Sequence, residues 1–129
     1  MKRLALEFYS NGFNCSQAIL KAVSKKFDIK LSNECINLCT GVNNGFGIQS
    51  ICSVLVACIM SLGLFFDDQT TKKLRIKFLN EFNLKYKSLN CERLSEKYSC
   101  KKIISDAADI IEKIILDARS SIQRCKNLN

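Results

Sequence analysis

The chain of 129 residues contains no proline and only five glycines. A sandwich or barrel of many short strands needs turn residues every ~8–12 positions, so the sequence disfavours that class of fold. Hydrophobic residues make up 47% of the sequence and charged residues 25%, a balance that excludes a disordered or fibrous chain. We expect residues 1–129 to form one helical domain whose last few residues are frayed.

Apolar residues recur at helical spacing in several segments of the chain. The clearest segment is Ser99–Arg124, in which Ser99 can cap the N-terminus of a helix. Asn14 can cap a second helix within Phe13–Phe27. Further predicted helices cover Lys2–Ser10, Ser32–Thr40 and about Asp68–Tyr86. We therefore predict an all-α, single-domain bundle of about five to six helices.

A stretch without any charged residue extends from Cys35 to Phe66. Within it, Ile48–Phe66 would span about 28 Å as one helix, which is just enough to cross a bilayer core. Polar residues dilute this run and no Trp/Tyr belt brackets it, so membrane insertion is disfavoured. We expect it to form one central, fully apolar helix of the bundle instead. The preceding loop, Gly41–Gly47, is either a plain helix connection or a backbone lip over a reactive site.

The expected cellular compartment and the net charge limit the kinds of binding partner that we expect. Glu7 interrupts the short apolar run near the start, so we expect no signal peptide and a cytoplasmic protein. The formal net charge is +8, and basic residues concentrate between positions 72 and 87. We interpret this concentration as a solvated helix face, because no nucleic-acid-binding motif accompanies it. Nucleic acid is therefore disfavoured as a partner.

Cysteine is the residue type that points to chemistry. The chain has no histidine, which excludes Ser-His-Asp and Cys-His catalysis and histidine-ligated zinc or haem. It has eight cysteines. In a reducing cytoplasm, cysteines are more often catalytic, redox-sensing or metal-bound than joined in structural disulfides.

Four of the cysteines have positions that suit reactive thiols. Cys15, Cys52 and Cys100 lie near the N-termini of predicted helices, and Cys91 lies in the predicted short connection Ser88–Leu94. Free N–H groups at a helix N-terminus stabilise a thiolate, so we expect Cys15 and Cys100 to have low pKa values. The alternative for each is that it packs as a small buried hydrophobe.

The other four cysteines give weaker signals. Cys35 and Cys39 are four apart in one predicted helix, so their sulfurs would share a face and supply two ligands to a soft metal. Cys58 is expected to lie in the core and Cys125 to be exposed near the chain end. No CxxC motif, the strong redox or zinc signature, occurs in the chain.

Four motifs follow one another along the chain: Asn14-Cys15-Ser16-Gln17-Ala18, Gly45-Phe46-Gly47 followed by Cys52, Asn90-Cys91, and Cys100 followed by Asp106-Ala107-Ala108. Their order resembles the C_GCAxxG_C_C family of redox-active proteins. The resemblance implies that the family's four cysteines correspond to Cys15, Cys52, Cys91 and Cys100. It also implies a cytoplasmic helical protein with a thiol redox or metal-binding role. Where relatives favour small residues after the second cysteine, this chain has Ser53, Val54 and Ala57.

Two functions therefore remain open from the sequence. In the first, Cys15, Cys52, Cys91 and Cys100 converge and cycle between thiol and disulfide, with Cys15 and Cys100 as the attacking thiols, which would make the protein a thiol oxidoreductase. Its partner would be a redox protein or a small-molecule substrate, and it would need no cofactor. In the second, the same four thiolates bind a soft metal or an iron–sulfur cluster. We favour the first, because metal sites usually contain a closely spaced pair of cysteines.

Overall fold

The computed structural model describes residues 1–128, and within them the fold is all-α, with seven α-helices and no strand. The predicted fold class is thus confirmed. The helices are α1 (Lys2–Ser10), α2 (Cys15–Lys26), α3 (Asn33–Asn37), α4 (Ser53–Leu62), α5 (Asp68–Tyr86), α6 (Cys91–Lys97) and α7 (Cys100–Leu128). A short 3₁₀ helix, η1 (Leu38–Val42), and an irregular turn, η2 (Gly45–Gln49), connect α3 to α4.

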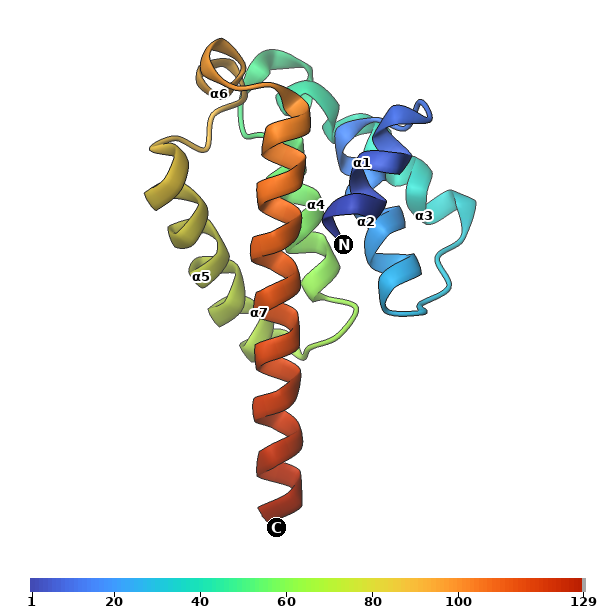
Figure 1. Cartoon of the computed structure of the whole chain (residues 1–129), viewed down its shortest axis with the longest axis vertical. Coiled ribbons are helices and arrows are strands. Elements are labelled where there is room, and N and C mark those ends of the chain that lie inside the picture. Colours follow the sequence, from blue (N-terminus) through green and yellow to red (C-terminus); the bar gives the residue numbers. More distant parts are fainter. Residues whose placement is uncertain (129) are drawn as a thin grey trace.

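The long helix α7 is the element against which most of the others pack. It runs the length of the molecule, with α5 on one side, α1 and α2 on the other, and α4 behind it in the view of Figure 1. Its buried face is the predicted apolar stripe, which includes Ile104, Ile111 and Ile115. The helix continues to Leu128, past the predicted end at Arg124, and its last part projects beyond the body of the bundle. The last few residues of the chain were expected to be frayed, and one of them, Asn129, lies outside the described residues.

The charge-free segment does not form one long helix, and the prediction of a helix over Ile48–Phe66 is wrong. α4 occupies only Ser53–Leu62, because the chain before it turns through left-handed backbone conformations and then pairs Ile51 with Asn90 in an antiparallel bridge. α4 is apolar apart from the buried Ser53 and Ser61, and only Met60 among its residues is exposed. None of the helices in residues 1–128 combines the length and hydrophobicity that a membrane span requires.

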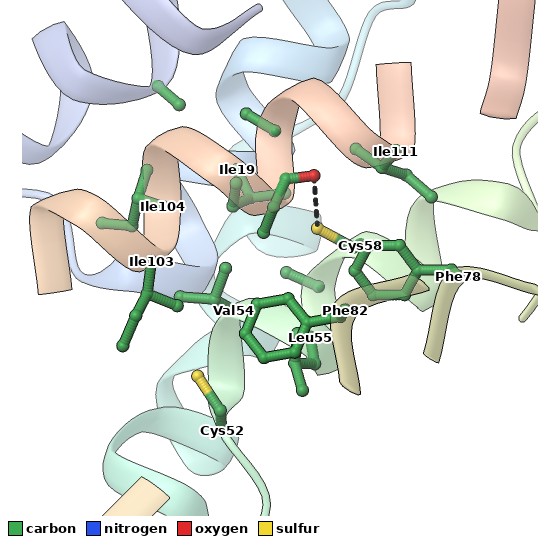
Figure 2. Close-up of a cluster of buried hydrophobic side chains, with 14 of the residues drawn as sticks. Ile19, Cys52, Val54, Leu55, Cys58, Phe78, Phe82, Ile103, Ile104 and Ile111 are labelled. Atoms are coloured by element: carbon green, nitrogen blue, oxygen red, sulfur yellow. Dashed lines mark hydrogen bonds between the residues drawn. The ribbon is translucent and has the colours of Figure 1, made fainter. Parts of the chain in front are cut away.

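One part of the core lies where α4, α5 and α7 meet, and α1 and α2 contribute buried residues to the same cluster. Phe78 and Phe82 of α5 and Leu55 of α4 are fully buried there (Figure 2). Cys58 is also fully buried, and its thiol donates to the Ala107 carbonyl at an Sγ–O distance of 4.0 Å. Burial raises the pKa of Cys58 well above its usual value, in agreement with its predicted place in the core.

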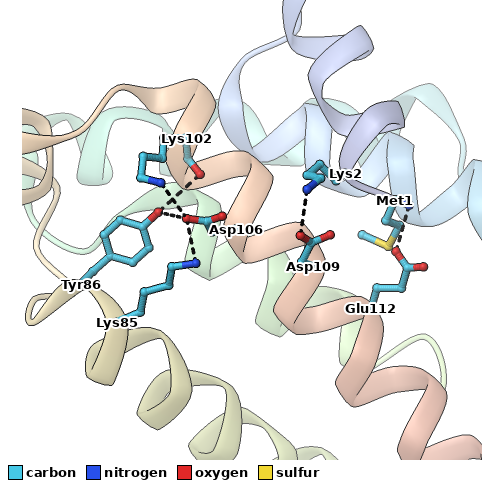
Figure 3. Close-up of polar contacts among 8 residues, drawn as sticks. All are labelled: Met1, Lys2, Lys85, Tyr86, Lys102, Asp106, Asp109 and Glu112. Atoms are coloured by element: carbon cyan, nitrogen blue, oxygen red, sulfur yellow. Dashed lines mark hydrogen bonds and ion pairs between the residues drawn. The ribbon is translucent and has the colours of Figure 1, made fainter.

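A polar cluster joins α5 to the first turns of α7. The Tyr86 hydroxyl donates to the Asp106 carboxylate, which also pairs with Lys85 Nζ at 3.2 Å and Lys102 Nζ at 3.6 Å (Figure 3). Partial burial opposes ionisation of Asp106. The hydrogen bonds from Tyr86 and Lys85 and the charges of both lysines outweigh that opposition and lower its pKa. The cluster therefore stabilises the packing of α5 on α7 while Asp106 is ionised.

We expect Asp106→Asn to lower the free energy of unfolding by about 1 kcal/mol at pH 7, the size of one hydrogen bond to a partly exposed charged group. Because folding lowers the pKa of Asp106, its contribution is fully present above the usual carboxyl pKa of 3.8 and is lost as the pH falls through the folded value. Urea unfolding of both proteins between pH 7 and pH 3 measures the effect, and the difference should shrink at the acid end.

Asp109→Asn is the matched control. Asp109 lies on the same helix and pairs with Lys2 Nζ at 3.3 Å, but both side chains are about half exposed (Figure 3). Exposed ion pairs contribute little, so this variant should change stability by less than about 0.5 kcal/mol. Equal losses in the two variants would show that the Asp106 cluster has no special role.

Candidate functional site

The four predicted cysteines come together in one cavity. Cys15, Cys52, Cys91 and Cys100 all line a cavity of about 340 Å³ near the starts of α2, α4, α6 and α7. The other lining residues are polar but uncharged or apolar: Asn43, Asn44, Ser53, Val54, Leu94, Ser95 and Ile103. Each of these helices therefore has a cysteine at its start that lines the cavity: the first residue of α2, α6 and α7, and the N-cap residue of α4.

N-capping positions three of these cysteines. In each case a capping side chain accepts a hydrogen bond from a backbone N–H in the first turn, and the next residue in the chain is a cysteine. The acceptor–donor pairs are Asn14 Oδ1 with Gln17 N at 2.9 Å, Asn90 Oδ1 with Arg93 N at 3.1 Å, and Ser99 Oγ with Lys102 N at 3.2 Å. The cysteine after each cap is thus the first residue of its helix.

Cys91 does not lie in a connecting segment, as the sequence suggested, but begins helix α6. The signal that could have revealed this helix is Asn90 before the cysteine, the same arrangement that Asn14 makes with Cys15. The helix has only seven residues, too few for a clear apolar repeat.

Backbone pairing brings Cys52 next to Cys91. Around the bridge between Ile51 and Asn90, the Cys52 N–H donates to the Leu89 carbonyl at 3.0 Å, and the Cys91 N–H donates to the Ser50 carbonyl. Cys52 is itself the N-cap residue of α4, although its side chain makes no capping hydrogen bond. Two cysteines 39 positions apart in sequence are thereby held at one edge of the cavity.

The glycine loop forms part of this site. Asn43 and Asn44 line the cavity, and the Cys91 thiol donates to Asn44 Oδ1 at an Sγ–O distance of 4.0 Å. Gly45 has a φ of +60°, and a Cβ atom there would lie 2.9 Å from the Cys91 Cβ and closer still to the Ser50 nitrogen. Of the two interpretations of this loop, the structure favours the lip over the cysteines.

Burial, rather than helix position, dominates the acidity of the enclosed cysteines. Burial, with smaller contributions from the neighbouring Cys100 and Cys52 thiolates, raises the pKa of Cys15 to about 12. Burial likewise raises the pKa of Cys52 to about 11, although the amides of Val54 and Leu55 act in the opposite direction. The prediction that Cys15 is an acidic, readily attacking thiol is therefore wrong. Cys100, in contrast, is exposed to solvent.

The remaining cysteines lie away from the cavity. Cys35 is exposed on α3 and Cys39 is fully buried in η1, so the predicted shared face does not form. Cys125 is exposed, as predicted, although it lies within α7. Within the described part of the chain, no three cysteine or carboxylate side chains are grouped so that they could hold a metal ion.

The fold and the site define a helical protein with four cysteines at helix starts around one cavity. The model of the family described as "Putative redox-active protein (C_GCAxxG_C_C)" matches residues 13–114, a range that contains all four. The chain belongs to this family, which confirms the resemblance seen in its motifs. No curated protein and no solved structure matches the chain.

We expect Gly45→Ala to destabilise the protein by about 2–3 kcal/mol, because it combines a strained left-handed conformation with overpacking against Cys91 and Ser50. Gly47→Ala is the matched control, since Gly47 has a φ of +78° but open space where a Cβ would lie. It should cost only the conformational strain, about 1 kcal/mol. Chemical denaturation measures both, and equal costs would show that Gly45 does not pack closely on the Cys91 segment.

Proposed function

We propose that the protein is a cytoplasmic thiol oxidoreductase whose four-cysteine cavity exchanges disulfides with a small partner molecule. The observation that supports this most strongly is the convergence of Cys15, Cys52, Cys91 and Cys100, from four helices, on one cavity. The membership of the chain in a family described as redox-active agrees with it.

The difference in exposure assigns separate roles to two of the thiols. Cys100 is exposed and can be reached by an incoming disulfide, whereas Cys15 is partly buried beside it. Cys100 therefore attacks the substrate, and Cys15 resolves the product. This replaces the expectation from sequence that both thiols attack.

The exchange proceeds in two balanced steps. The Cys100 thiolate attacks one sulfur of a disulfide R–S–S–R′, forms Cys100–S–S–R and releases R′S⁻. Cys15 then loses its proton and attacks the Cys100 sulfur, which forms the Cys15–Cys100 disulfide and releases RS⁻. The two thiol protons end on the released thiolates, so the substrate is reduced by two electrons and the protein is oxidised by two.

Charge coupling between Cys15 and Cys100 sets the order of the two exchange steps. Burial raises the pKa of Cys15 most and the charge of a Cys100 thiolate raises it in the same direction, so Cys15 stays protonated while Cys100 is free. Once Cys100 is in a mixed disulfide, it carries no charge and the repulsion disappears. Cys15 then ionises more easily, at the step in which it must attack.

The lining of the cavity suggests the class of substrate. No charged side chain lines it, although the chain as a whole carries a net charge of +8. Its volume of about 340 Å³ is at the low end of the range for small-molecule sites. A small, uncharged disulfide fits this lining better than an anionic one.

We expect Cys15→Ser to trap the mixed disulfide on Cys100. When the reduced variant is mixed with 2-hydroxyethyl disulfide, Cys100 should hold one 2-hydroxyethyl thiol group, because the proposed resolving thiol has been removed. The wild-type protein should instead accumulate an internal disulfide between Cys15 and Cys100. Mass spectrometry of peptides prepared at acid pH detects both species.

Cys125→Ser is the matched control, since Cys125 is exposed like Cys100 but lies outside the cavity. This variant should behave as the wild type does. The proposal fails if Cys125 captures the reagent as readily as Cys100, or if no reversible disulfide forms among the four cysteines. Stoichiometric zinc, or iron with sulfide, in protein purified without oxygen would favour the metal-binding alternative.

A further inference from the structure

Ser53 carries a hydroxyl group at the four-cysteine cavity that the exchange reaction does not use. It is the first residue of α4 and lines the cavity together with its chain neighbours Cys52 and Val54. Only 4% of its surface is exposed, so the residue is more than nine-tenths buried. A hydroxyl at such a buried position normally has a hydrogen-bond partner, because burying an unpaired polar group is costly.

The Ser53 hydroxyl has no hydrogen-bond partner within residues 1–128. Other serines near it are paired: Ser61, fully buried in the same helix, donates to the Cys58 carbonyl at 2.6 Å, and Ser95 donates to the Cys91 carbonyl at 2.7 Å. Among the described residues, every side-chain oxygen that is sealed from solvent has a partner. The unpaired Ser53 hydroxyl is therefore open, and the cavity that it lines is the space into which it opens.

The start of α4 adds backbone donors beside this hydroxyl. The first amides of a helix have no carbonyl partner within the helix. At the other three helix starts around the cavity a side chain caps one of these amides, but the Cys52 side chain makes no such bond. Within the described part of the chain the Ser53 amide donates to no carbonyl. The groups that are free at this end of the cavity are thus hydrogen-bond donors.

We propose that the start of α4 is an oxygen-binding subsite, in which the Ser53 hydroxyl donates a hydrogen bond to a hydroxyl or carbonyl oxygen of the substrate. This inference rests on the proposed function and narrows its substrate class to an uncharged disulfide with an oxygen acceptor a few bonds from the sulfur. A carboxylate suits the subsite less well, because the Cys100 thiolate in the same cavity would repel it. Ser53 is a specificity-determining residue and takes no part in the electron transfer.

The subsite and the attacking sulfur are close enough to act on one molecule. Ser53 and Cys100 line the same cavity of about 340 Å³, which holds a single small ligand. A substrate that places its sulfur against Cys100 therefore extends its substituent towards Ser53. A substrate without an oxygen there would cover the hydroxyl and leave it unpaired, and this penalty is what discriminates between the two.

The test compares two disulfides that differ only in this oxygen. In 2-hydroxyethyl disulfide each half ends in a hydroxyl, and in dipropyl disulfide a methyl group replaces it. Each is added to the reduced Cys15→Ser protein, and mass spectrometry follows the mixed disulfides on Cys100 and on Cys125, which is exposed outside the cavity. Relative to Cys125, Cys100 should favour the hydroxyl reagent by about fivefold, the effect of one hydrogen bond.

Adding Ser53→Ala to this protein should abolish the preference by slowing only the reaction with the hydroxyl reagent. Ser61→Ala is the matched control, since it removes a buried hydroxyl from the same helix at a position outside the cavity. It should leave the preference of Cys100 unchanged. Equal slowing of both reagents by Ser53→Ala, or the same loss of preference in Ser61→Ala, would overturn the inference.

The comparison of Cys100 with Cys125 in the Cys15→Ser protein needs no change at Ser53, so the inference stays testable if Ser53→Ala folds poorly. If Cys100 captures both reagents in the ratio that Cys125 shows, the oxygen-binding subsite is contradicted and the exchange reaction stands. If Cys100 captures neither reagent, the proposed function fails, and the subsite fails with it.

Discussion

Helix N-capping is the interaction on which the arrangement of the cysteines depends. Asn14, Asn90 and Ser99 each bind a first-turn amide and thereby set the residue at which a helix begins. Because a cysteine follows each cap, the three helix starts that surround the cavity deliver their sulfurs to it. The fourth cysteine, Cys52, is itself the N-cap residue of α4, without a capping hydrogen bond from its side chain. Packing of the bundle brings the N-termini of these four helices together, and the capping residues determine that cysteines stand at those N-termini.

Two physical effects compete at these helix starts, and burial is the larger. A helix N-terminus stabilises an anion by about 0.3–1 kcal/mol, which is less than one pKa unit, whereas burial can shift a pKa by several units. Cys15 and Cys52 are enclosed and their pKa values rise, although both stand where a thiolate would be favoured. The exposed thiol of Cys100 avoids this penalty. The site therefore contains thiols of different accessibility, which an ordered disulfide exchange requires.

The helices were predictable where apolar periodicity and a capping residue agree, as they do for α2, α5 and α7, and the four site cysteines were identifiable from their motifs. The start of α4 was not predictable, because the left-handed turn before it depends on contacts with Cys91 and Asn90, which are distant in sequence. The short helix α6 was not predicted either, because it has too few residues to show an apolar repeat. The pKa of Cys15 was expected to be lowered and is instead raised. Its position at a helix start can be inferred from the sequence, but its burial by neighbouring elements cannot.

The most direct test of the central claim, that four cysteines from four helix starts share one cavity, is cross-linking of the reduced, folded protein with a short bifunctional thiol reagent. Peptide mapping should find bridges among Cys15, Cys52, Cys91 and Cys100. Cys35 and Cys125 are exposed but lie outside the cavity, so they should take up the reagent at one end only. Bridges that join Cys35 or Cys125 to the four as often as the four join one another would contradict the claim, as would the absence of any bridge among the four.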